Sequence, residues 1–132
     1  MILHNIGNTI EIMEKDILTH PVKVDLDNQG WTYSSYVRAG DFIFTSICSG
    51  FGDTIKESTE TALNQLKGYL NHAGSDLDDF VKVTVTFKRG ENFDEMKPVF
   101  MEYFPNGYPA RNTILVDEFL GKTIKLQIEG FA

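Results

Sequence analysis

The stretch VKVTVTFKRG, residues 81–90, is the clearest element of the chain. Its apolar and polar residues alternate, with Val81, Val83, Val85 and Phe87 set against Lys82, Thr84, Thr86 and Lys88. A period of two places successive side chains on opposite faces of a strand. The pattern therefore predicts a strand with one face covered by a core and the other left more polar.

Helical patterns lie on both sides of this strand. Residues 57–74, ESTETALNQLKGYLNHAG, repeat apolar residues every three or four positions and end at Gly74, which is typical of a helix with a glycine cap. Residues 92–104, NFDEMKPVFMEYF, predict a second helix with Asn92 as N-cap. Pro98 removes a backbone donor, so we expect this helix to kink there or to begin only at Pro98.

Further strands are predicted toward both ends of the chain. Residues 111–116 and 123–131 indicate two strands, and the β-branched run after Arg111 suggests that the first of them is buried. Residues 42–48, FIFTSIC, predict a strand covered on both faces, following a tight turn at 39–41. Weaker alternation at 9–12 and 22–26 predicts two short strands.

This order of elements is strands, helix, strand, helix and two strands. It favours an α+β fold with a mixed sheet, crossover connections and two helices on one face. The other sheet face would carry aliphatic and polar residues, and a bare face of that kind invites oligomerisation. A length of 132 residues predicts a single domain.

Composition excludes several classes of function. Twelve basic and nineteen acidic residues give a net charge of -7, which opposes nucleic-acid binding. Cys48 is the only cysteine, so no disulfide forms within the chain, and we expect a cytoplasmic protein in which Cys48 is a buried small hydrophobe. The N-terminus has neither a basic leader nor a long apolar stretch, so no signal peptide and no membrane association are expected.

No metal is expected either. The three histidines, His4, His20 and His72, are widely separated and show no ligand spacing with one another or with Cys48. The sequence also has no glycine-rich phosphate loop of the kind that binds nucleotides.

Arg111 stands at the mouth of its strand, within YPARNT at 108–113. A guanidinium offers five donors in one plane and grips a carboxylate through two parallel hydrogen bonds. Arg111 therefore predicts an anion site. Its ordinary alternative is an ion pair with one of the nineteen acidic residues.

Several strings together resemble the reactive-intermediate deaminase family, also called Rid or YjgF. They are YSSYVRAGDFIFTS at 33–46, ALNQLKGYLNHAGSDLDDFVKVTV at 62–85, NFDEMKPVFMEYF at 92–104, YPARNTILV at 108–116 and KLQIEGFA at 125–132. The resemblance runs from about Tyr33 to Ala132. We interpret residues 1–132 as a single domain of this kind, with residues 1–30 as an N-terminal extension.

The resemblance implies a chorismate-mutase-like fold and a homotrimer with clefts between subunits. It also implies hydrolysis of reactive enamines and imines, such as 2-aminoacrylate, to 2-oxo acids and ammonia, with no cofactor. The arginine that holds the substrate carboxylate in the family falls on Arg111. The family's tyrosine falls on Tyr33 and its serine on Ser46.

Four positions differ from the deaminase pattern of the family. Ile47 and Thr113 stand where a glycine and a cysteine are usual, and Lys97 replaces an asparagine. Gln127 replaces the glutamate that activates water, whereas Glu129 matches a second acid of that motif.

Gln127 can orient water but cannot accept its proton, and losing a general base usually costs ~100- to 10,000-fold in rate. Glu129 shares the strand face of Gln127 but lies roughly 6.6 Å further along, too far for a simple substitution. Lys97 could act as a base if it were buried, or it could add positive charge to the anion site; an exposed helix lysine is its ordinary reading.

The predicted site combines two catalytic residues, Arg111 and Gln127, with six substrate-binding residues: Tyr33, Ser46, Ile47, Lys97, Thr113 and Glu129. Tyr33, Ser46 and Thr113 also suit ordinary packing or local hydrogen bonding in strands. Two functions stay open, an imine hydrolase and a non-catalytic trimer that binds small carboxylates or 2-oxo acids. Endoribonuclease activity, a label that some relatives carry, ranks last because of the negative charge.

Overall fold

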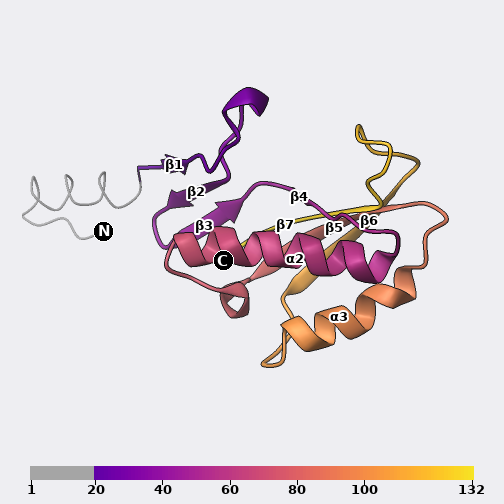
Figure 1. Ribbon diagram of the computed structural model, residues 1–132. Coiled ribbons are helices and arrows are strands. Elements are labelled where there is room, and N and C mark those ends of the chain that lie inside the picture. The colour runs from indigo at the N-terminus through magenta and orange to yellow at the C-terminus, as the bar shows by residue number, and fades with distance from the viewer. Residues whose placement is uncertain (1–19) are drawn as a thin grey trace, which may run out of the picture.

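The computed structural model describes residues 20–132, and Figure 1 shows the arrangement of the elements. The strands are β1 (Val22–Val24), β2 (Tyr36–Ala39), β3 (Phe42–Thr45), β4 (Cys48–Ser49), β5 (Lys82–Lys88), β6 (Ala110–Val116) and β7 (Leu126–Phe131). The helices are α2 (Ile55–His72) and α3 (Met96–Tyr103), with short 3-10 turns at Gln29–Trp31, Leu77–Asp79 and Phe93–Glu95. The strand predicted at 9–12 lies outside the described residues.

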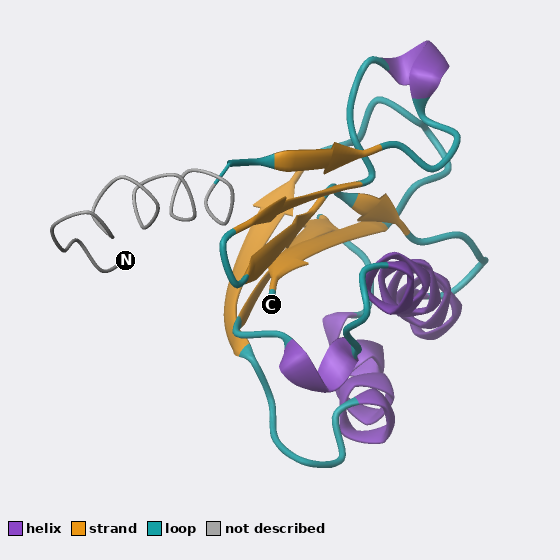
Figure 2. Ribbon diagram, turned by 90° about the vertical axis from the view of Figure 1, so that its left-hand side faces the viewer, coloured by secondary structure: helices purple, strands orange, loops and turns teal. Residues whose placement is uncertain are grey.

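The strands form one mixed sheet in the order β1-β2-β3-β7-β5-β6, with β4 also paired to β7. β5 and β6 are parallel, whereas β4 and β5 both run antiparallel to β7. α2 therefore connects β4 to β5, and α3 connects β5 to β6, as crossovers between strands of the same direction. Both helices lie on the same face of the sheet (Figure 2), which confirms the predicted α+β architecture.

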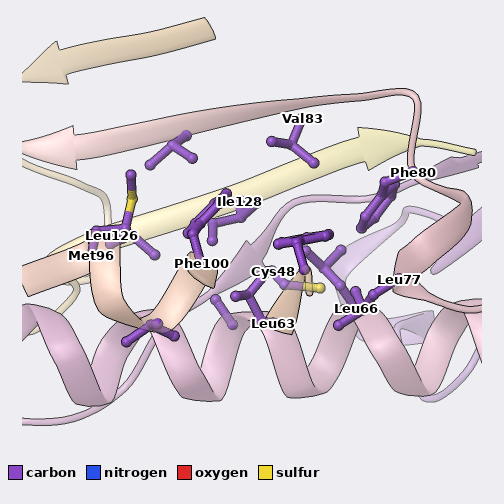
Figure 3. Close-up of a cluster of buried hydrophobic side chains, with 14 of the residues drawn as sticks. Cys48, Leu63, Leu66, Leu77, Phe80, Val83, Met96, Phe100, Leu126 and Ile128 are labelled. Carbon is purple, nitrogen blue, oxygen red and sulfur yellow. The ribbon is translucent and has the colours of Figure 1, made fainter. Parts of the chain in front are cut away.

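The core lies between this sheet face and the helices. Figure 3 shows Leu63 and Leu66 of α2 gathered with Leu126 and Ile128 of β7, and all four are fully buried. The alternation predicted for β5 is confirmed, because its side chains alternate between buried and half-buried along the whole strand. Only Val81 departs, since it precedes the strand and is 51% exposed. Cys48 is fully buried, as predicted.

α2 begins two residues earlier than its predicted start. The Thr54 side chain accepts a hydrogen bond from the Glu57 backbone N–H at 3.1 Å, which caps the first turn. At the other end, Ala73 is the C-cap and Gly74 has a φ of 85°. This left-handed conformation suits glycine and confirms the predicted helix end.

The break in the second helical segment falls before Pro98. The Asn92 side chain accepts from the Asp94 N–H at 3.2 Å and caps a 3-10 turn, after which α3 starts at Met96. Pro98 is thus the third residue of α3, within the first turn, where a missing N–H costs no regular helical hydrogen bond. The expected start at Pro98 is wrong by two residues.

The strand predicted at 42–48 is two strands. β3 follows β2 through a tight turn at Gly40, whose φ is 59°, and ends at Thr45. The chain then changes partner, since β4 pairs with β7. Phe42 and Phe44 are 47% and 41% exposed on the face away from the helices, so the expectation of two covered faces is wrong.

β6 is an edge strand, and this overturns the expectation that Arg111 leads into a buried one. Its only partner among the described strands is β5, and every residue from Ala110 to Leu115 is exposed. A β-branched run suits a pleated surface that a neighbour covers on one side only, so residue type alone does not separate edge from centre.

The face of the sheet opposite the helices, here called the open face, carries two sorts of side chain. Phe42, Phe44 and Phe131 form an aromatic cluster there, with the Phe44 and Phe131 ring centroids 5.5 Å apart. Beside it, strand pairing aligns Glu129 with Thr84 and Asn112. No described helix covers this face, as the sequence predicted (Figure 2).

Candidate anion site at the edge of the sheet

Arg111 is the second residue of β6 and faces the helices. It pairs in register with Val83, whose side chain is fully buried beneath them. The guanidinium carbon lies 5.6 Å from the ring centroid of Phe93 and 5.6 Å from that of Phe100. Each ring attracts a cation through its quadrupole, so the two rings hold the guanidinium while leaving its donors available.

A cavity of about 450 Å³ opens beside this guanidinium. Its lining residues are Lys97, Phe100, Met101, Tyr108, Pro109 and Arg111. The walls are mostly apolar and the charged groups are cationic, which is the composition of a site for a small anion with an organic body.

No acid of the described chain neutralises Arg111. Five ion pairs occur within residues 20–132, and Arg111 takes part in none of them. The other reading of Arg111, as the partner of an acidic residue, therefore has no support in that part of the chain.

Lys97 is the second cation of the cavity. It lies on α3 at three and four residues from Phe100 and Met101, which places the three side chains along one stripe of the helix. Its Nζ is 3.3 Å from Asp94 Oδ1, and its side chain is 64% exposed. Lys97 is thus not buried, so the condition for a role as base is not met and its positive charge is what it brings to the cavity.

Thr113 follows Arg111 on the same face of β6. It pairs with Val85, which is buried beneath the helices like Val83, as expected for residues two apart. The structure therefore brings Arg111, Lys97 and Thr113 to one side of the sheet.

Gln127 and Glu129 project from the open face. Gln127 pairs with Thr86 and Ser49, and its Nε2 donates to Ser49 Oγ at 3.1 Å. Glu129 lines a cavity of about 410 Å³ formed by Phe44, Thr45, Lys82, Thr84, Asn112, Glu129, Gly130 and Phe131. From strand spacing and rise, Gln127 is on the order of 14 Å from Arg111. One chain therefore does not bring the two predicted catalytic residues together.

Tyr33, Ser46 and Ile47 lie elsewhere again. Tyr33 lines a cavity of about 320 Å³ together with Asp25, Asn28, Thr32 and Ser34. Burial is the largest cause of a raised pKa of Tyr33, and the nearby Tyr69, Cys48 and Asp25 also raise it. Ser46 and Ile47 link β3 to β4; the Ser46 N–H donates to the Ser35 carbonyl at 2.8 Å, and the Ile47 side chain is exposed.

Sequence reasoning missed the aromatic rings around Arg111. Phe93 and Phe100 fall within the helix predicted at 92–104, where apolar side chains are typical of a core-facing stripe. The other missed lining residues are Met101, Tyr108 and Pro109. Tyr108 and Pro109 immediately precede the Ala110-Arg111 pair. Their closeness to Arg111 in the sequence was the one signal that they line the same cavity.

Two properties of the described residues bear on other classes of site. Residues 20–132 contain no cluster of three or more His, Cys, Asp or Glu side chains suited to a metal ion. Within the same range, neither helix combines the length and apolar character needed to cross a bilayer. The cytoplasmic location stays a prediction.

Comparisons with known proteins agree on the family. A RutC family protein of Pyrococcus abyssi is 35% identical over 108 residues, covering 76% of this chain and 84% of that protein. A protein of Dermatophagoides farinae named 2-iminobutanoate/2-iminopropanoate deaminase is 27% identical over 105 residues, covering 74% of this chain and 81% of that protein.

The fold is shared with solved structures. A Mycobacterium tuberculosis member of the YjgF/YER057c/UK114 family aligns with a TM-score of 0.78 at 23% identity, over 85% of this chain and 98% of that one. The sequence profile of the family described as Endoribonuclease L-PSP matches residues 28–132. The chain therefore belongs to the Endoribonuclease L-PSP family, which is also known as the Rid or YjgF family.

Proposed function

We propose that this protein is an imine deaminase, a hydrolase that converts small 2-imino acids to 2-oxo acids and ammonia without a cofactor. The observation that carries the proposal is Arg111, whose guanidinium lies near two phenyl rings at the wall of a cavity and is unpaired with any acid of residues 20–132. The deaminase name of the Dermatophagoides relative points to the same chemistry.

The reaction adds water to the imine carbon and releases ammonia. 2-Aminoacrylate tautomerises to 2-iminopropanoate, and water adds to the carbon of its protonated C=N bond to give a carbinolamine. A proton then moves from the new hydroxyl group to nitrogen, the C–N bond breaks, and 2-oxopropanoate and ammonium leave. Arg111 would hold the carboxylate through two hydrogen bonds, which fixes the adjacent electrophilic carbon.

Gln127 would orient the attacking water. Its Nε2 is engaged by Ser49, which leaves its carbonyl oxygen to accept a hydrogen bond from water. Thr113 and Lys97 would lie on the Arg111 side of the ligand. Tyr33, Ser46, Ile47 and Glu129 would complete the site from another chain.

A homotrimer with clefts between subunits would assemble such a site. Because Arg111 and Gln127 face opposite sides of one sheet, a ligand that touches both has to lie between two chains. Exposed apolar side chains support association: Phe42 and Phe44 lie on the open face, and Ile114 and Leu115 lie on the β6 edge. Sedimentation equilibrium tests this point; a monomer at micromolar concentration would overturn it.

The activity test compares two arginine variants. 2-Iminopropanoate is generated from alanine with an amino acid oxidase and catalase, and the imine that remains is trapped with semicarbazide. The wild type should accelerate imine loss and ammonia release over buffer, and Arg111→Ala should return both to the buffer rate. Arg89→Ala is the matched control, since Arg89 is exposed and pairs with Asp117 at 3.0 Å.

A second function is favoured by one observation. Gln127 is an amide fixed to Ser49 and cannot take a proton from water, which suits a trimer that binds small carboxylates or 2-oxo acids without turnover. In that case the wild type would leave the imine untouched, and 2-oxobutyrate would raise its melting temperature but not that of Arg111→Ala.

A further inference from the structure

The cavity beside Arg111 contains two cations and one apolar wall between them. Lys97, Phe100 and Met101 follow one stripe of α3, and Arg111 lies against the ring of Phe100. Lys97 lies at the N-terminal end of this stripe, and Arg111 lies opposite Phe100, near its middle. The two positive charges are therefore at different places along the cavity. This spacing suits two separate anionic groups joined by a short aliphatic segment.

The pairing of Lys97 does not prevent a second anion from binding. Its partner Asp94 is 79% exposed, and the two lie 3.3 Å apart at positions i and i+3 of the chain. Exposed pairs of this kind contribute little and exchange readily with other partners. A ligand carboxylate inside the cavity could replace Asp94 while Lys97 keeps its stem on the helix surface.

We propose that this cavity selects dicarboxylic 2-oxo and 2-imino acids, with one carboxylate on Arg111 and the second on Lys97. The inference rests on the proposed carboxylate role of Arg111 and adds the substrate class. Short diacids, such as those of five carbons, would bridge the two cations through an aliphatic segment. Their methylene groups would lie over Phe100.

The test compares two acids of equal length. Binding of 2-oxoglutarate and 2-oxopentanoate to the full chain is measured by calorimetry at low ionic strength. Wild type should favour the diacid by about three- to tenfold, and the preference should shrink as salt is added, because Lys97 is exposed. Lys97→Met, which keeps the apolar stem, should lower the affinity for 2-oxoglutarate more than the affinity for 2-oxopentanoate, so that the preference for the diacid is lost.

Two further variants sharpen the comparison. Lys56→Met is the matched control, since Lys56 is also a helix lysine with a 64% exposed side chain, and it should keep the preference. Asp94→Asn removes the competing carboxylate and should increase the preference.

Each outcome bears on one proposal or the other. Equal binding of the two acids by the wild type, or a diacid preference that survives in Lys97→Met, would overturn the inference while the carboxylate site at Arg111 stands. If neither acid binds, the proposed function fails together with the inference.

Discussion

Arg111 and Gln127 project from opposite faces of one sheet, two strands apart. Arg111 shares the helix-covered face with Val83, whereas Gln127 shares the open face with Thr86. A single chain thus separates the group that would hold the carboxylate from the group that would position water. Chemistry that uses both residues belongs to an assembly of chains.

The amide at position 127 should limit the rate. Gln127→Glu supplies a carboxylate at the same place, next to Ser49, and should raise kcat for 2-iminopropanoate by about 100-fold or more, since a positioned general base contributes that much. The pH profile of kcat should gain an acidic limb as the new carboxylate is protonated. Unchanged or lower kcat with intact folding would show that water is not activated at this position.

The rings around Arg111 should affect ligand affinity rather than stability alone. Phe93→Leu keeps an apolar side chain but removes one of the two rings that contact the guanidinium, and it should weaken 2-oxobutyrate binding by about two- to tenfold. Phe104→Leu is the control, because Phe104 packs on Phe100 with ring centroids 5.3 Å apart but is not one of the two rings that contact the guanidinium. Equal loss of affinity in both variants would contradict this role of the rings.

The Cys48 thiol should stay protonated and unreactive in the folded protein. Burial raises its pKa to about 12, so thiol reagents at pH 8 should label it only after unfolding. A raised folded-state pKa contributes stability that is fully present below the unfolded value of about 8.5 and is lost as pH rises above it toward 12. Urea unfolding from pH 7 to 11 measures this loss, and Cys48→Ala should lessen it. Rapid labelling of the native protein would contradict the burial of Cys48.

Two glycines should respond to alanine in opposite ways. A Cβ on Gly50 would meet the backbone of Ser58 in α2, with the carbonyl oxygen only 2.0 Å away, so Gly50→Ala should destabilise the fold by about 1–3 kcal/mol. Gly68 lies within α2, where an added Cβ meets nothing within 4 Å. Gly68→Ala should therefore stabilise the fold by roughly 0.5–1 kcal/mol. Equilibrium unfolding in urea compares both with the wild type.

The periodicity of the sequence correctly predicted those elements that have one buried face and one more exposed face. β5 has one face beneath the helices, and α2 buries a single stripe, so the pattern of each in the sequence matches its surroundings. Periodicity failed where strand pairing decides which side chains are covered. Phe42 and Phe44 suit a covered strand, yet they pack against Phe131 on the open face, and the partner change between β3 and β4 has no local signal.

The candidate site likewise has features that the sequence predicted and features that it did not. The chemistry of Arg111 could be predicted because a guanidinium at a strand entrance needs a partner. The shared face of Arg111 and Thr113 followed from their spacing of two. Their separation from Gln127 could not be predicted, because it depends on which strands pair and in which register. Phe93 and Phe100 reach Arg111 only through the packing of α3 against the sheet edge.

The most direct measurement is a calorimetric titration of 2-oxobutyrate into wild type and Arg111→Lys, which keeps the charge but loses the two-donor fork. We expect saturable binding by the wild type, at least tenfold weaker binding by Arg111→Lys, and no change in Arg89→Lys. Equal affinity in wild type and Arg111→Lys would show that the carboxylate is held elsewhere.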